Sequence, residues 1–268
     1  MKQLIRTGFS PCPNDCFIFD ALLHQKINVG NFTFEPVIED VEKLNQRAMR
    51  GELELTKMSY HAYLYCQELY TYLNSGSALG FGCGPLLITH SEDIQKQFFE
   101  PQSRRKMKVL IPGELTTAHY LLKKFFSDIS HKTSVLFSEI EDLLVQKRFD
   151  AGLIIHENRF TYPQKGLLKI VDLGALWEKE TGLPIPLGGI MVKRTLGTKT
   201  IQKIDSLVRQ SVEYAFQHYE DVLPFVRTHA QTMQEDVIKQ HINLYVNTYS
   251  IDLGAEGRKA IEYFCKNY

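Results

Sequence analysis

The regular alternation of short apolar runs with helical patterns constrains the fold of this chain more than any other feature. Residues 4–9 have the pattern of a strand, residues 17–25 that of a helix, and the alternation continues through 32–40, 41–51 and 53–59 before a helical pattern at 60–69. A second series follows, with strands and helices alternating over 108–113, 116–126, 134–139, 140–150 and 151–157. Alternating strands and helices are typical of α/β folds with a parallel sheet.

The stretches between and after these two series predict two lobes. Residues 91–108 are polar and charged, 169–194 are extended and punctuated by glycine and proline, and helical patterns fill the chain from Lys199 onward. We therefore expect a larger α/β lobe from residues 1–88 plus 193–268, which includes the C-terminal helices, and a smaller inserted α/β lobe from residues 89–192. A ligand cleft is expected between the lobes, where loops follow the carboxyl ends of strands. The glycine-rich residues 80–84 are expected to form a turn.

Composition favours a small-molecule partner. Acidic and basic side chains balance at 31 each, so no global field attracts nucleic acid or an anionic membrane. The first residues lack the apolar region of a signal peptide, which predicts a cytoplasmic location. Five cysteines at irregular spacing favour reduced thiols. Cys12 and Cys16 are either a weak metal clip or two small packed side chains, and we expect no metal site.

Two candidate binding segments follow strands of the first series. In residues 10–15 (SPCPND), two prolines stiffen a loop that contains Ser10 and Asn14, and Asn14 or Asp15 is expected to cap the next helix. Such a loop either presents N–H groups to a ligand or is a plain turn. Lys57 and Ser59 share one face of their strand and could together bind a polar group of a ligand. In the alternative interpretation, Lys57 is a solvated surface charge and Ser59 opens the next helix.

The second series contributes a helix start and a histidine. Thr116 and Thr117 stand where a helix begins, either as caps or as donors to a carboxylate or phosphate, which a helix N-terminus favours. His156 ends an apolar strand and is followed by Glu157. A neutral imidazole there is either a general base or a hydrogen-bonded structural group.

Together these segments resemble the 1,4-dihydroxy-6-naphthoate synthase family of the futalosine route to menaquinone. The likeness runs from SPCPND through TKMSYHAY, PGELTTAHYLL, IIHENRFTYP and TGLPIPLG to SIDLG near the C-terminus. It implies a two-lobed, periplasmic-binding-protein-like (type II) α/β fold used as a cytoplasmic enzyme. The implied reaction is a carbon–carbon lyase step that converts cyclic dehypoxanthine futalosine into 1,4-dihydroxy-6-naphthoate, without metal or organic cofactor.

The resemblance also implies the site residues. The catalytic histidine matches His156, and the ligand-binding stretches match Lys57, Met58 and Ser59 and also Thr116, Thr117 and Ala118. This chain departs from the family at Cys16, where threonine is usual, and at Leu176, where a second tryptophan is common before Trp177.

Other functions share this architecture. Chorismate dehydratase of the same pathway has the same fold, although IIHE and TGLPIPLG favour the synthase. A small-molecule solute-binding protein without catalysis, either cytoplasmic or exported, is the alternative from a different class. For partners we expect a small-molecule carboxylate substrate, no nucleic acid, no membrane, and either a single chain or a homodimer.

Overall fold

The computed structural model describes residues 2–230 and 234–267, and these divide into two compact units. The first unit contains the chain up to Gly80 and from Pro186 onward, and the second unit is Phe81–Ile185. The lobe boundaries predicted after residues 88 and 192 therefore lie several residues later in the chain than the observed ones, which follow Gly80 and Ile185. The strand at 86–89 pairs only with strands of the second unit, whereas the strand that starts at Ile185 joins the sheet of the first.

The first unit is built on a mixed sheet with strand order β2-β1-β3-β11-β4, and β5 pairs with β11. Strands β1 and β2 run parallel, as do β1 and β3, while β11 is antiparallel to β3 and β4. The strands are β1 (Gln3–Phe9), β2 (Phe32–Ile38), β3 (Leu55–Ser59), β4 (Tyr70–Tyr72), β5 (Ala78–Gly80) and β11 (Ile185–Lys193).

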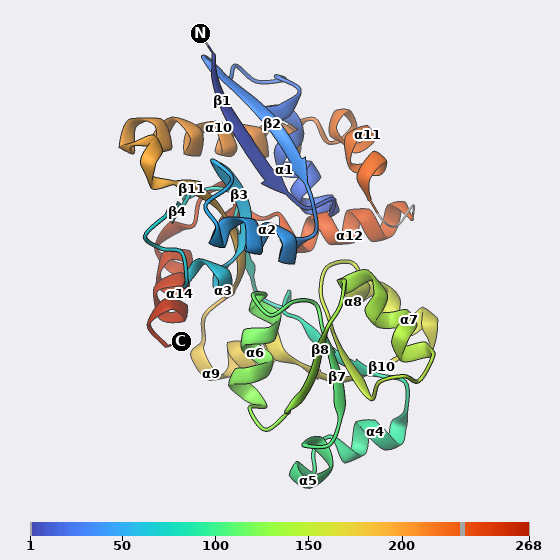
Figure 1. Cartoon of the computed structure of the whole chain (residues 1–268). Helices are drawn as coiled ribbons and strands as arrows, with labels where there is room; N and C mark the ends of the chain where they lie inside the picture. The colour runs from blue at the N-terminus through green and yellow to red at the C-terminus, as the bar shows by residue number, and fades with distance from the viewer. Residues whose placement is uncertain (1, 231–233, 268) are drawn as a thin grey trace. The chain divides into compact units, whose positions relative to one another are not determined.

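The helical segments of this unit lie around its sheet (Figure 1), and α1, α10, α11 and α12 share one large apolar core with it. Their bounds are α1 (Pro13–Leu23), α2 (Val41–Met49), α3 (Tyr60–Tyr63), η3 (Arg194–Leu196), α10 (Thr198–Gln217), α11 (Tyr219–His229), α12 (Glu235–Tyr245), α13 (Thr248–Ile251) and α14 (Gly254–Lys266). The all-helical C-terminal segment is confirmed. The predicted helix at 60–69 is wrong beyond its first turn, because β4 follows and pairs with β11.

The second unit has the strand order β10-β6-β9-β7-β8. Strand β7 is parallel to β8 and β9, whereas β6 is antiparallel to β9 and β10. The strands are β6 (Leu86–Thr89), β7 (Lys108–Ile111), β8 (His131–Ser134), β9 (Ala151–Ile154) and β10 (Leu168–Asp172). The predicted strand at 134–139 therefore lies too late, and a 3₁₀ turn occupies Phe137–Glu139.

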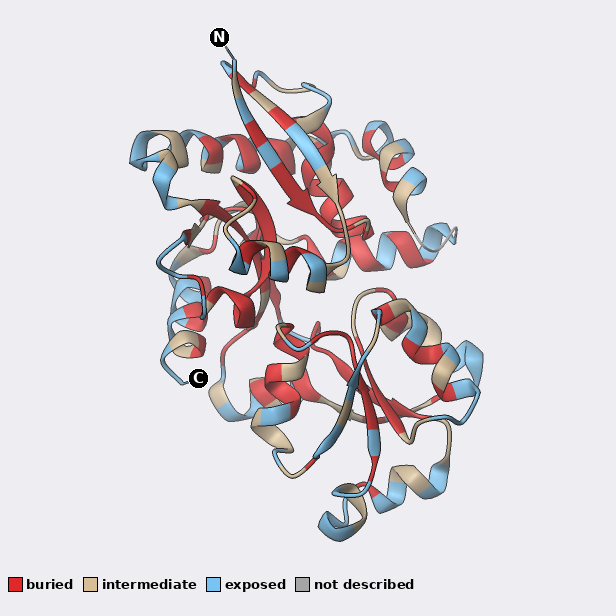
Figure 2. Ribbon diagram, in the orientation of Figure 1, coloured by how far each residue is buried: buried red, intermediate tan, exposed pale blue. Residues whose placement is uncertain are grey.

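The helical segments of the second unit are α4 (Glu92–Gln97), α5 (Pro101–Arg104), α6 (Thr117–Phe125), η1 (Phe137–Glu139), α7 (Ile140–Val145), α8 (Asn158–Thr161), η2 (Tyr162–Lys165) and α9 (Leu173–Thr181). Helix α9 lies within the stretch that was predicted to be extended, where its N-cap Asp172 accepts a hydrogen bond from the N–H of Ala175. In Figure 2 buried residues follow the strands and the inner sides of the helices in each unit.

Two glycines bring the start of β6 close to α9. A Cβ on Gly84 would lie 2.3 Å from the Cα of Gly174, and a Cβ on Gly174 would lie 2.6 Å from the Cα of Gly84. Both positions therefore exclude any side chain, because the neighbouring atoms are backbone. Within the described residues, no helix combines the length and the apolar character needed to cross a bilayer.

Candidate functional site

In the first unit, two candidate segments follow the parallel strands β1 and β3 at the same edge of the sheet. Helix α1 starts at Pro13, and its N-cap is Cys12, which makes no side-chain capping bond. The prediction that Asn14 or Asp15 caps this helix is therefore wrong. Proline is favoured at the first helical position because its missing N–H is not needed there, so Asn14 and Asp15 fall inside the first turn.

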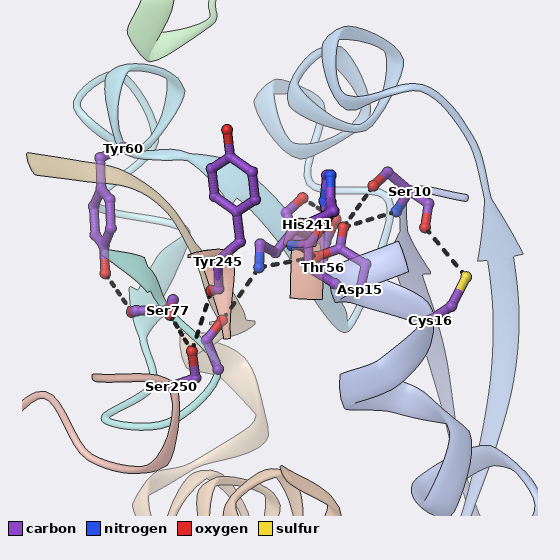
Figure 3. A network of polar contacts seen from close by, with 12 residues as sticks. Ser10, Asp15, Cys16, Thr56, Tyr60, Ser77, His241, Tyr245 and Ser250 are labelled. Carbon is purple, nitrogen blue, oxygen red and sulfur yellow. Dashed lines mark hydrogen bonds and ion pairs between the residues drawn. The ribbon is translucent and has the colours of Figure 1, made fainter. Parts of the chain in front are cut away.

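Asp15 is the centre of a buried polar network at this edge (Figure 3). Its Oδ2 accepts hydrogen bonds from the Ser10 backbone N–H at 3.1 Å and from the Ser10 hydroxyl at 2.7 Å. Its Oδ1 accepts from the Asn14 side-chain amide at 2.9 Å and forms an ion pair with Lys57 Nζ, also at 2.9 Å. Four donors on one carboxylate, one of them a cation, satisfy a charge that would be costly to bury alone.

Lys57 is a buried cation and not a solvated one. Its side chain is 7% exposed, and its ammonium also donates to the carbonyl oxygen of Gly76 at 3.2 Å. An ammonium has three N–H groups, so within the described chain the partners Asp15 and Gly76 leave one for a ligand oxygen. This result excludes the alternative that Lys57 is a surface charge.

Ser59 and Met58 lie at the end of β3 in different surroundings. The Ser59 backbone N–H donates to Asn45 Oδ1 at 2.9 Å, and Asn45 Nδ2 donates to the Ser59 hydroxyl at 3.1 Å. Ser59 precedes helix α3 without capping it by its side chain. The Met58 side chain is fully buried beside Cys66, so only the backbone of Met58 is available at this edge.

Cys16, the residue that departs from the family pattern, is fully buried below the same loop. Its thiol donates to the carbonyl oxygen of Ser10 at 3.9 Å (Figure 3). Burial raises the pKa of this thiol, and the nearby Asp15 charge raises it further, so the group stays protonated. Cys12 is also buried.

In the second unit, four loops meet at one edge because of the strand directions. Strands β7 and β9 end there, and the antiparallel β6 and β10 bring Leu86 opposite Ile154 and Asp172 opposite Leu86. Arg159 joins these loops, because its guanidinium donates to the Gly84 carbonyl oxygen at 2.7 Å and to Asp172 Oδ2 at 3.3 Å. Arg159 was not among the predicted site residues, although it belongs to the IHENRF segment.

Thr116 is the N-cap of α6, so its capping interpretation is confirmed. Its hydroxyl accepts from the His119 N–H at 3.2 Å and donates to the Gly113 carbonyl oxygen at 2.8 Å. Thr117 and Ala118 are buried in the first turn of α6. A ligand oxygen at this helix start would therefore meet backbone donors and the positive end of the helix dipole.

His156 lies two residues beyond the end of β9 and has an unusual backbone conformation. Its φ is +58°, in the left-handed region that side chains other than glycine and asparagine seldom adopt. The imidazole is half-buried, and its centroid lies 4.8 Å from the ring of buried Phe137. Strained residues of this kind concentrate at functional sites, where surrounding packing holds them in place.

Glu157 is almost fully buried beside His156 and has an altered acidity. Burial and, to a smaller extent, the negative charge of Glu141 raise its pKa to about 7. Glu141 is itself buried and forms an ion pair with Lys165 at 3.0 Å. A carboxylic acid that keeps its proton close to neutral pH therefore lies next to the candidate base.

We expect replacement of Glu157 by glutamine to remove a pH dependence of stability. The native pKa of about 7 exceeds the ordinary value of 4.5, so between these values the native state binds more protons than the unfolded state. Rising pH therefore lowers the free energy of unfolding across this window, by about 3 kcal/mol in total. Urea unfolding of Glu157→Gln at pH 5 to 8 should show this slope flattened relative to the wild type.

Glu139→Gln is the matched control, because Glu139 is an exposed glutamate of the same unit. A wild-type slope that persists in Glu157→Gln and disappears in Glu139→Gln would contradict the assignment to Glu157.

The structure gathers most of the predicted residues into two groups, one in each unit. Ser10, Asn14 and Lys57 meet on Asp15, while Thr116 to Ala118 and His156 follow the neighbouring strands β7 and β9. Sequence reasoning missed the partners that orient them: Asp15 as a network centre, Asn45, His241 and Arg159. The DCFIF segment contained a signal for Asp15, because an acidic residue in a first helical turn is often bonded to the preceding loop.

Comparison with known proteins assigns the family. Residues 5–268 match the family described as menaquinone biosynthesis. A protein of Thermus thermophilus named 1,4-dihydroxy-6-naphthoate synthase is 45% identical over 97% of this chain and 92% of its own. One of the same name from Streptomyces coelicolor is 39% identical over 96% of this chain and 90% of its own.

This chain belongs to the 1,4-dihydroxy-6-naphthoate synthase family. Its family members are enzymes of menaquinone biosynthesis, and the solute-binding alternative is not favoured. A solved protein of Archaeoglobus fulgidus superposes on this synthase-family chain with a TM-score of 0.90 at 28% identity, covering 98% of this chain and 97% of that one.

The fold is that of periplasmic binding proteins, as the family resemblance implied. The aliphatic sulphonate binding protein of Escherichia coli superposes with a TM-score of 0.64 at 12% identity, covering 100% of this chain and 93% of its own. At this identity the likeness concerns the fold alone.

Proposed function

We propose that this enzyme is a carbon–carbon lyase that converts cyclic dehypoxanthine futalosine into 1,4-dihydroxy-6-naphthoate, with His156 as the general base. Membership of the synthase family supports the reaction. The observation that carries the role of His156 is its left-handed backbone at the end of β9, beside Phe137.

The chemistry requires only a base and binding groups. Removal of the proton beside the substrate ketone leaves an electron pair that delocalises into the carbonyl group. The bond to the sugar-derived fragment then breaks, the fragment leaves as the second product, and the imidazolium returns its proton to the products. The ring becomes an aromatic naphthalenediol, so aromatisation drives the step. One imidazole with a pKa near the working pH is suited to this proton transfer.

Two polar groups are the candidates to bind the substrate carboxylate and the sugar hydroxyls. The positive end of α6 offers the N–H group of Ala118, and the β1 and β3 edge offers Lys57 with Ser10, Asn14 and the Ser59 loop. Lys57 supplies the positive charge on that edge, while the helix start supplies aligned dipoles. Both are complementary to a carboxylate.

The test is incubation of the purified protein with cyclic dehypoxanthine futalosine, with product followed by mass and by naphthalenediol absorbance. We expect 1,4-dihydroxy-6-naphthoate to appear, and its formation to continue after chelator treatment. Tight binding of the substrate without product would refute the lyase assignment. We also propose a cytoplasmic location for this reaction, as the family resemblance implies, and immunodetection in fractionated cells would check it.

A further inference from the structure

His241 connects a C-terminal helix to the binding edge of the first unit. It lies on α12, is fully buried, and its Nε2 is 2.8 Å from Asn14 Oδ1, 227 residues away in sequence. Figure 3 shows His241 beside Asp15 and Ser10. The ring also packs against Tyr245, with a centroid distance of 4.7 Å.

The two hydrogen bonds of the Asn14 side chain determine which His241 nitrogen carries the proton. An ionised carboxylate only accepts, so the Asn14 group that faces Asp15 Oδ1 must be the amide nitrogen. The Asn14 oxygen then faces His241, and an amide oxygen also only accepts. His241 therefore carries its proton on Nε2 and donates it to Asn14.

Asn14 also connects His241 to the ion pair between Asp15 and Lys57. Asp15 Oδ1 is shared by Asn14 and Lys57, so a reversed amide would place its oxygen against the carboxylate and displace the ion pair. On its other side Lys57 is held by Gly76, whose own N–H donates to the Ser250 carbonyl oxygen at 2.7 Å. Lys57 is thus held between the Asp15 carboxylate and the Gly76 carbonyl oxygen. The orientation of the Asn14 amide determines whether the Asp15 carboxylate is in place.

We propose that His241 is a positioning residue: by donating to Asn14 it selects the amide orientation that holds Asp15, and through Asp15 it aims Lys57 and Ser10 at the substrate. The inference rests on the proposed function for the role of Lys57 in binding. His241 itself contacts no substrate, so its loss acts on affinity more than on the proton transfer at His156.

Four variants test this assignment. His241→Gln keeps an N–H near the place of Nε2, whereas His241→Asn is too short to reach Asn14 and His241→Leu has no donor. Ser211→Ala is the matched structural control. Its buried hydroxyl donates to the Ile18 carbonyl oxygen at 2.6 Å and so ties α10 to the same helix α1, but outside the network.

Kinetics give the first measurement. We expect KM to rise about tenfold or more in His241→Leu and His241→Asn, the effect of one lost hydrogen bond in a charged network, with a smaller change in kcat. His241→Gln should stay within about threefold of the wild type, as should Ser211→Ala even though its melting temperature falls.

Two measurements need no substrate. Nitrogen-15 NMR should show the proton of His241 on Nε2, and the carbon-13 signal of Lys57 Cε, assigned with Lys57→Met, should move in His241→Asn and His241→Leu but not in His241→Gln or Ser211→Ala. Absence of turnover in the wild type would refute the proposed function. The NMR results alone would then decide whether His241 orients Asn14 and Lys57. Three results would overturn the positioning role of His241. The first is a proton on Nδ1 alone, and the second is an unchanged Lys57 signal in His241→Asn and His241→Leu. The third is a wild-type KM in these two variants.

Discussion

Replacement of His156 by asparagine is expected to lower kcat by a factor of about a thousand, the usual contribution of a general base. Asparagine is the suitable replacement because it tolerates the left-handed backbone at φ +58°, so loss of the base is separated from backbone strain. Substrate affinity should remain close to that of the wild type, because the proposed binding groups on α6 and on β1 and β3 are unchanged. Steady-state kinetics and calorimetric binding of the substrate measure these two effects.

The matched control is His131→Ala, which removes an exposed histidine from the same unit and should leave kcat unchanged. A His156→Asn enzyme with more than about a tenth of wild-type kcat would remove His156 from the role of base. In that case Glu157, the buried acid beside it, would be the next group to replace.

Replacement of Asp15 by alanine is expected to lower the free energy of unfolding by about 3–5 kcal/mol, because it leaves the buried ammonium of Lys57 without its carboxylate. Three further donors also lose their acceptor: the Ser10 N–H, the Ser10 hydroxyl and the Asn14 amide. Urea unfolding followed by circular dichroism measures the loss. The double variant Asp15→Leu with Lys57→Met should recover much of it, since apolar side chains of similar size replace both charges.

Glu213→Ala is the control for this experiment. Glu213 pairs with Arg209 at 2.9 Å on one helix face, but the two side chains are 39% and 50% exposed, so we expect a change below about 0.5 kcal/mol. A loss under about 1 kcal/mol in Asp15→Ala would contradict a buried, essential ion pair. Because Asp15 also holds Lys57, this variant should lose substrate affinity as well.

The same network shows how far local chemistry predicted the site. Ser10 and Asn14 were predicted from the polar loop that follows the first strand, and Lys57 from its place near the end of another strand, without knowledge of a shared partner. Asp15 was predicted as a cap, because the helical pattern was expected to begin at Phe17 and aspartate is a favoured N-cap residue. The structure starts the helix at Pro13 and turns Asp15 back to Ser10.

Hydrogen bonds and burial settled two structural alternatives that the sequence left open. Thr116 is a cap, and Lys57 is a buried ion and not a surface charge. For His156 the structure adds a backbone conformation that no sequence rule indicates, since φ depends on what packs around the residue. The boundaries between the units shifted because strand pairing, and not local composition, assigns β6 and β11 to their sheets.

The sequence by itself determined the α/β class, the order of most strands and helices, the helical C-terminal segment and the family. These properties follow from periods of two and 3.6 residues and from contiguous motifs, which are local. Only the tertiary structure decided which polar groups meet: His241 with Asn14 across 227 residues, Lys57 with Asp15, and Arg159 with Gly84 and Asp172. Such contacts arise from strand order and helix packing, and a buried polar group must take the partner that the fold places beside it.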